Sequence, residues 1–211
     1  MRLEAAEDLA WRTILRLYAD YGRPPAPADM VTASGIAAED LAGMLQSLQS
    51  HDLIDLDPQT GDIRLAYPFT QAATGHRVKL GGHVLHALCA IDALGVAGMY
   101  GTDIAISSPC LHCGSQVNVE TASNGKSLRS VAPSEAAVWY DFAYDASAAT
   151  SCCPAIAFFC SDEHLRQWVN DQRPPRNGLA MTMDEALEVG RAIFGPVLVE
   201  RCDNCNDFVF S

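Results

Sequence analysis

Eight cysteines constrain this chain more than any other feature of its sequence, and four of them form two C-x2-C pairs. The chain opens MRLEAAEDLAW, which lacks the basic segment and the following apolar segment of an export signal. In the reducing cytoplasm, cysteines bind metal ions or take part in reactions more often than they form disulfides. We therefore expect a cytoplasmic protein whose cysteines hold a metal ion or take part in a reaction.

Composition and charge exclude several classes of partner. Of the 211 residues, 49% are hydrophobic and 19% are charged, which suits a packed core rather than a disordered or fibrous chain. The formal charge of -12 would repel phosphate backbones and anionic membranes. The most apolar stretch, residues 84–100, is interrupted by His86 and Asp92. We expect neither nucleic acid nor membrane as a partner.

The sequence predicts a winged-helix-like N-terminal domain over residues 1–70. Apolar periodicity and chain breakers predict three helices followed by a β-hairpin, at residues 4–21, 27–34, 38–50 and 53–67. The commonest use of such a module is DNA binding. Five basic residues against eleven acidic ones in this range argue against that use. We expect the domain to act as a packing scaffold or as a lid over a substrate.

A small polar linker at residues 70–76 precedes a second domain, residues 76–211. Periodicity and capping residues predict both helices and strands within it. The helices are expected at 82–97, 161–171 and 182–194, and the strands at 104–107, 117–120, 139–144 and 155–159, with two closing strands around 202–205. The fold class is therefore α+β, with mixed or antiparallel strands in the second domain.

Two C-x2-C pairs lie in turns between strand-like segments, Cys110 with Cys113 and Cys202 with Cys205. Together they offer four thiolates to one tetrahedral zinc ion, and Gly114 relieves the tight backbone after the first pair. We predict that these four cysteines hold a structural zinc ion as a zinc knuckle. The alternatives are surface thiols or a relay for soft metal ions. His112, inside the first pair, is expected to be exposed rather than a ligand.

The other four cysteines include two candidates for chemistry. Cys89 lies three residues before Asp92, so on the expected helix a thiol and a carboxylate share one face in an apolar stretch. Such surroundings would raise the pKa of Asp92 and keep a proton available, although a plain buried thiol beside a backbone-bonded carboxylate is the alternative. Cys152 and Cys153 precede a core strand, and a vicinal pair favours a metal or redox role over a mutual disulfide. Cys160 is expected to be a packed or half-exposed thiol.

Three segments follow one another in the order HALCAIDALG at 86–95, ISSPC at 106–110 and CCPAIAFF at 152–159. With them the sequence resembles the organomercurial lyases, also called alkylmercury lyases. The helix that contains Trp168, the GLAMTMDEAL stretch at 178–187 and the N-terminal three-helix unit extend the resemblance over most of the chain. The resemblance implies a winged-helix-like domain followed by an alkylmercury-lyase-like α/β domain.

The resemblance also implies a catalytic triad. The family pattern of a cysteine, four residues and two phenylalanines selects Cys153 as the partner of Cys89, with Cys152 as the substitute and Asp92 as the acid. Mercury is a soft cation, so two thiolates would capture R-Hg⁺ while the acid protonates the departing carbon. The implied products are a hydrocarbon and Hg(II), which Cys89, Asp92 and Cys153 would hold until small external thiols or a mercuric reductase removes it. No organic cofactor is implied.

Cys113 and Cys205 depart from the family pattern, in which the position of Cys110 is a lone structural cysteine. An added zinc knuckle would take over the stabilising role of that thiol, or it would mark a branch that has lost mercury chemistry. The first hypothesis is therefore an organomercurial lyase. The alternatives are a non-catalytic thiol protein that binds Zn, Cu(I) or Hg for storage or sensing, and an acidic winged-helix protein whose zinc ribbon mediates protein contacts.

Overall fold

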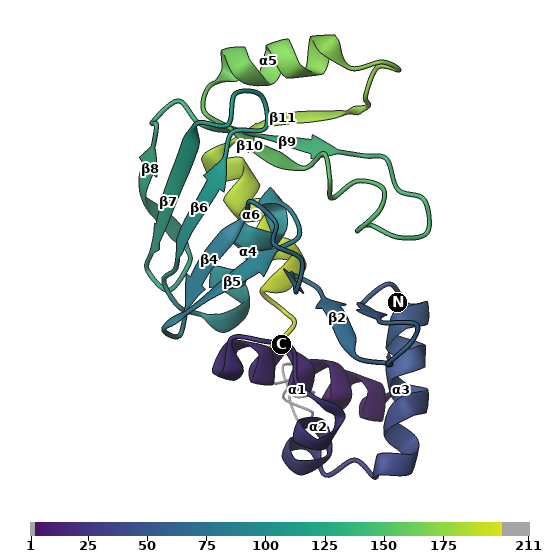
Figure 1. The fold of residues 1–211 in the computed structure, drawn as a ribbon. Helices are drawn as coiled ribbons and strands as arrows, with labels where there is room; N and C mark the ends of the chain where they lie inside the picture. Colours follow the sequence, from purple (N-terminus) through teal and green to yellow (C-terminus); the bar gives the residue numbers. More distant parts are fainter. Residues whose placement is uncertain (1–2, 200–211) are drawn as a thin grey trace, which may run out of the picture.

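Two antiparallel sheets and six helices make up residues 3–199, the part of the chain that the computed structural model describes (Figure 1). The helices are α1 Ala5–Tyr21, α2 Pro27–Ser34, α3 Ala38–Ser50, α4 Ala90–Tyr100, α5 Asp162–Asp171 and α6 Met183–Phe194. The strands are β1 Ile54–Leu56, β2 Ile63–Ala66, β3 Phe69–Thr70, β4 Arg77–Leu80, β5 His83–Ala87, β6 Ala105–Pro109, β7 Gln116–Ala122, β8 Ser127–Ala132, β9 Ala137–Asp141, β10 Ala157–Phe159 and β11 Gly178–Thr182. The predicted α+β class is confirmed.

The three N-terminal helices form where the sequence predicts them, and they group at one end of the molecule (Figure 1). Helices α1 and α2 each end at a glycine in the left-handed region, Gly22 and Gly35, with φ of 67° and 71°. Strands β1 and β2 pair as the expected antiparallel hairpin. The winged-helix class of residues 1–70 and the domain boundary at residue 70 stay predictions.

The larger sheet runs through both expected domains. Its strand order is β1-β2-β3-β5-β4-β6-β7-β8, and every neighbouring pair is antiparallel. Strand β3 joins the N-terminal hairpin to the rest, because it pairs with β2 on one side and with β5 on the other. The smaller sheet has the order β10-β9-β11, and α5 lies at the far end of the molecule beside it (Figure 1).

The single helix expected over residues 82–97 is wrong in its first half. Residues 83–87 are strand β5, which pairs with β4 across Gly81 and Gly82, and both glycines have positive φ. Two alternating segments around a Gly-Gly turn are the signal of a β-hairpin, and apolar content alone obscured it. As a result Cys89 caps α4 instead of lying inside it. Strands β3, β4, β8 and β11 also form beyond those expected, and the turn of the two closing strands expected around residues 202–205 lies outside the described residues.

The second half of that stretch, α4, is almost completely buried and packs directly on α6. Two glycines make the contact close. A Cβ atom added at Gly190 would lie 2.8 Å from the backbone nitrogen of Gly95 and 3.0 Å from the carbonyl oxygen of Ile91. Because both neighbours are backbone atoms, any side chain here would force the helices apart.

Within the described residues, no helix combines the length and the apolar character that crossing a bilayer requires.

Replacing Gly190 with alanine should therefore lower the free energy of unfolding by roughly 1–3 kcal/mol, the usual cost of overpacking. The matched control is Gly43→Ala, since Gly43 lies in helix α3 and a Cβ there meets no atom within 4 Å. That control should be neutral or stabilise the protein by up to about 1 kcal/mol, because alanine favours helix. Urea unfolding of the three proteins checks both values, and equal stability of Gly190→Ala and the parent would contradict the close contact.

Candidate active site

Helix α4 positions the first two side chains of the site at its N-terminus. Cys89 is the N-cap residue, and its Sγ accepts a hydrogen bond of 3.4 Å from the backbone N–H of Asp92. The N–H of Ala90 donates to the carbonyl of Ile156 at 3.0 Å, which joins the start of α4 to the segment that contains the vicinal cysteines. A helix N-terminus stabilises negative charge, so this end of α4 suits a thiolate or a carboxylate.

Cys153 completes a cluster with these two residues. Its Sγ donates to Oδ2 of Asp92 at 3.8 Å, and the candidate ligand atoms of Cys89, Asp92 and Cys153 all lie within 4.8 Å of one another. All three side chains are buried. Cys152 is half-buried, and its Sγ faces the carbonyl of Ala148 at 3.8 Å. The structure therefore brings Cys153, rather than Cys152, to the acid and the first thiol.

Burial dominates the electrostatics of the cluster. It raises the pKa of Asp92 to about 7, although hydrogen bonds with Cys89 and Cys153 counteract part of the shift. Burial, the hydrogen bond with Cys153 and the charge of Asp92 together raise the pKa of Cys89 well above its usual value. At neutral pH the cluster therefore keeps the proton of Cys89, and Asp92 lies near the midpoint of its titration.

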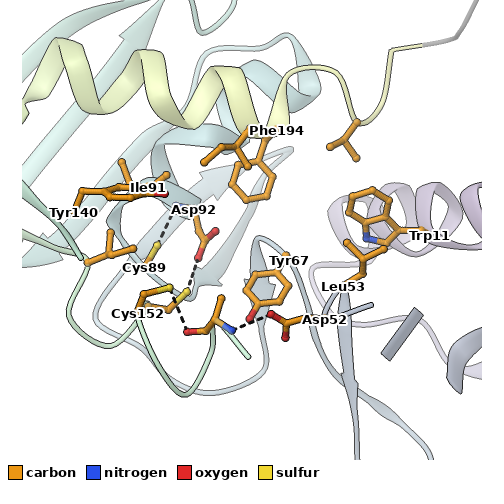
Figure 2. Close-up of a pocket in the computed structure, with 15 residues that line it drawn as sticks. Trp11, Asp52, Leu53, Tyr67, Cys89, Ile91, Asp92, Tyr140, Cys152 and Phe194 are labelled. Carbon is orange, nitrogen blue, oxygen red and sulfur yellow. Dashed lines mark hydrogen bonds between the residues drawn. The ribbon is translucent and has the colours of Figure 1, made fainter. Parts of the chain in front are cut away.

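The cluster lines a mostly apolar pocket of about 260 Å³ (Figure 2). Segments far apart in the sequence build it, from helix α1 to the segment after α6. The lining residues are Trp11, Asp52, Leu53, Tyr67, Cys89, Ile91, Asp92, Tyr140, Ala148, Cys152, Cys153, Ile156, Ile193, Phe194 and Val197. An apolar pocket with a few convergent polar groups suits a small organic molecule. Residues of both expected domains thus shape one site.

Asp52 is a residue of the site that the sequence did not single out. It directly follows the C-cap of α3 with φ of 56°, a conformation that aspartate tolerates better than most residues. Its Oδ2 accepts hydrogen bonds from the N–H of Ala148 at 2.9 Å and from the hydroxyl of Tyr144 at 3.3 Å. The carbonyl of Ala148 in turn accepts from the N–H of Cys153 at 2.9 Å. The N-terminal part therefore holds the loop that presents Cys153.

The structure describes only two of the four cysteines predicted to bind zinc. Cys110 and Cys113 lie in the turn between β6 and β7, as expected, whereas Cys202 and Cys205 fall outside the described residues. His112 is exposed, also as expected. The structure adds two neighbours from another segment: Cys160 and His164 lie with Cys110 and Cys113 so that four candidate ligand atoms are within 4.8 Å of one another. Cys160 is half-buried, in agreement with the packed or half-exposed thiol expected from the sequence, but its place beside the other two cysteines and His164 was not predicted.

Comparison with known proteins places the chain in a family. The family model described as MerB, alkylmercury lyase, matches residues 69–195, which include Cys89, Asp92 and Cys153. The chain belongs to the alkylmercury lyase family. An alkylmercury lyase of Staphylococcus epidermidis is 30% identical over 189 residues, which cover 88% of this chain and 82% of that protein. As a member of the alkylmercury lyase family, the chain is an enzyme.

A solved structure shares the fold of this alkylmercury lyase family member. The crystal structure of the mercury-bound form of MerB2 superimposes with a TM-score of 0.78 and covers 94% of each chain. Its sequence is 24% identical, so this comparison concerns the fold alone. The resemblance that the sequence motifs suggested is confirmed by the family match. The roles of Cys89, Asp92 and Cys153 stay predictions.

The raised pKa of Asp92 predicts a specific pH dependence of stability. Between the usual pKa of 3.8 and the folded value of about 7, the unfolded chain loses this proton while the folded protein keeps it. The contribution of the Asp92 carboxyl to the free energy of unfolding therefore falls as pH rises from about 4 to about 7, and it levels off above pH 7. From pH 5 to pH 8, the free energy of unfolding should fall by about 3 kcal/mol more in the parent than in Asp92→Asn.

Urea unfolding of both proteins under reducing conditions at the two pH values measures this difference. Comparing the two pH-induced changes cancels any general effect of the substitution on stability. Equal changes in the two proteins would show that the carboxyl of Asp92 is not held in a buried, proton-retaining environment.

Proposed function

We propose that the pocket cleaves the carbon-mercury bond of organomercurials by protonolysis, releasing a hydrocarbon and Hg(II). The observation that carries this proposal is the convergence of two thiols and one carboxyl group, all buried, on an apolar pocket. The family match and the name of the Staphylococcus epidermidis relative support the same substrate class. The apolar lining suits the organic group, and the sulfur atoms suit the soft metal.

Cys89 and Cys153 are proposed to bind the mercury atom of the substrate. Sulfur is the preferred ligand of mercury, and the two Sγ atoms lie close enough to bind one mercury atom together. The raised pKa of Cys89 means that this thiol gives up its proton as the sulfur-mercury bond forms. Cys153 is favoured over Cys152 as the second thiol, since Cys153 is the one whose Sγ meets the carboxyl of Asp92.

The proposed reaction balances without any external acid or redox partner. The substrate enters as R-Hg-SR′, where R′S is a small thiol. Two S–H bonds of the protein break and two sulfur-mercury bonds form, while the bonds from mercury to SR′ and to R break. One proton goes to the departing SR′ group, which leaves as the small thiol, and the other goes to carbon, which leaves mercury with its bonding electron pair. Because mercury stays Hg(II) and no electrons are exchanged with another molecule, the proposed reaction calls for no redox cofactor.

Asp92 is proposed to deliver the proton to carbon. A group that transfers a proton near neutral pH works best with a pKa close to the working pH, and burial raises the pKa of Asp92 to about 7. Its carboxyl group accepts a hydrogen bond from Cys153, so the thiol proton has a direct route to the acid. Asp92, Cys89 and Cys153 would then hold the Hg(II) product until external thiols, or a mercuric reductase, remove it.

The direct test is release of benzene from a phenylmercury compound in the presence of excess small thiol. The parent protein should release benzene catalytically. Asp92→Ala should lower the rate by at least about 100-fold, the usual contribution of a positioned acid, while still capturing mercury through its thiols. Gas chromatography measures benzene, and mercury analysis of the desalted protein measures capture.

The vicinal cysteines provide the matched control for the second thiol. Cys153→Ser should lose benzene release, whereas Cys152→Ser should retain most of it. The reverse pattern would move the catalytic role to Cys152. Stoichiometric capture by the parent without benzene release would overturn the lyase function and support a storage or sensing protein instead.

A further inference from the structure

A second cluster of sulfur and nitrogen ligands lies outside the candidate active site. It consists of Cys110, Cys113, Cys160 and His164, which we call the Cys3His cluster, and their candidate ligand atoms lie within 4.8 Å of one another. None of the four residues lines the pocket that contains Cys89. Buried and exposed members occur together: Cys110 is buried, Cys113 is exposed, and the other two are half-buried.

The backbone around the first two cysteines already has the form of a metal-binding turn. The N–H of Gly114 donates to the carbonyl of Cys110 at 2.8 Å, and Gly114 has φ of 76°, which favours glycine. The N–H of Cys110 donates to the carbonyl of Ser115 at 2.7 Å and closes the turn. The N–H of Ser115 points at Sγ of Cys113 at 3.5 Å. A backbone donor aimed at sulfur favours the thiolate that a metal ion requires.

The other two ligands come from the junction between β10 and α5. Cys160 directly follows β10, and Ser161 caps α5, so His164 lies in the first turn of that helix. Sγ of Cys160 and Nδ1 of His164 are 3.0 Å apart. The N–H of Leu111 donates to the carbonyl of Phe158 at 3.0 Å, which fastens the cysteine turn against the end of β10. The four side chains are thus brought together by backbone contacts on both sides.

Two of the three ligand-atom distances lie within about 0.4 Å of those expected for tetrahedral zinc, and the 3.0 Å between Sγ of Cys160 and Nδ1 of His164 is about 0.5 Å shorter. Zinc bonds to sulfur and nitrogen place two sulfur ligands about 3.8 Å apart, and a sulfur and a nitrogen ligand about 3.5 Å apart. The Sγ atoms of Cys113 and Cys160 are 3.7 Å apart, and Sγ of Cys110 is 3.9 Å from Nδ1 of His164. The first distance is far too long for a disulfide, and all three cysteines are free thiols.

We propose that the Cys3His cluster binds one zinc ion in a structural site. Four protein ligands complete the tetrahedron and leave no open position for a substrate, which is the mark of a structural rather than a catalytic zinc site. This assignment replaces Cys202 and Cys205 of the expected ligand set with Cys160 and His164, and it does not depend on the proposed lyase function.

The position of the cluster indicates what the ion does for the fold. Cys110 and Cys113 belong to the β6–β7 turn of the larger sheet, whereas Cys160 and His164 follow β10 of the smaller sheet. One ion would therefore clamp the two sheets together. Strand β10 follows shortly after Cys153 in the chain, so the clamp also restrains the end of the segment that carries the second active-site thiol.

Metal analysis of protein purified without added mercury tests the proposal. The parent should contain about one zinc ion per chain. His164→Gln and Cys113→Ser should lose that zinc, while His112→Gln, a histidine in the same turn whose ring packs on that of His164, should keep it. The double variant Cys202→Ser/Cys205→Ser should also keep its zinc.

Cobalt substitution gives a readout that does not depend on whether a variant folds. Co(II) in the parent should show the strong visible bands of a tetrahedral site and a sulfur-to-metal charge-transfer band of three thiolates, and X-ray absorption of the zinc protein should show three sulfurs and one nitrogen. Absence of zinc from the parent, a four-sulfur shell, loss of zinc from the Cys202/Cys205 variant, or retention by His164→Gln would each overturn the proposed ligand set.

Discussion

Burial of the Asp92 carboxyl group between two thiols is the constraint on which the rest of this structure depends. An isolated charge in an apolar interior is costly, and the protein meets that cost by letting the carboxyl group retain its proton to about pH 7. The backbone around it is arranged to keep this group and the sulfurs in place. Cys89 caps α4, the start of α4 is bonded to the segment after Cys153, and the two glycines between α4 and α6 allow the helices to pack without a gap.

The N-terminal part of the chain completes the site instead of standing apart from it. Trp11 and Leu53 line the pocket, and Asp52 holds the loop that presents Cys153. The larger sheet continues from the N-terminal hairpin through β3 into the central strands. The acidic charge of the N-terminal part does not oppose this role, because the part contacts the pocket and the Cys153 loop of the same chain instead of a nucleic acid.

The cysteines divide by environment. Cys89 and Cys153 are enclosed by apolar side chains beside an acid, which suits a reaction in which thiols give up protons to a departing group. Cys113 and Cys160 lie toward the surface beside a histidine, where a closed set of four ligands suits a permanently held ion. The fold thus separates two groups of thiols, one lining a pocket and the other between the two sheets, and the two functions proposed for them follow this separation.

Local signals in the sequence determined much of the fold. Helices α1, α2, α3, α5 and α6 form where capping residues and apolar periodicity predicted them, because a helix is specified by residues within a few positions of one another. The short separation of Cys89 and Asp92 also brings these two residues together, although the contact is made by the N-cap of α4 and not by two residues inside the helix. The family motifs pointed to Cys153, and in the structure its Sγ lies 3.8 Å from the carboxyl of Asp92, while its catalytic role stays a prediction.

Tertiary structure decided what depends on distant partners. Strand β5 was mistaken for helix although a local signal, the Gly-Gly turn that joins it to β4, was present in the sequence. What the sequence does not encode locally is its pairing with β3 on the other side. Cys160 and His164 joined Cys110 and Cys113 only because β10 lies beside the β6–β7 turn, a contact between segments 47 residues apart. No local pattern encodes such an approach, since it results from how two sheets pack. The sequence by itself therefore determined five of the six described helices and the local pair of Cys89 and Asp92, and the packing of distant segments decided which other side chains meet them.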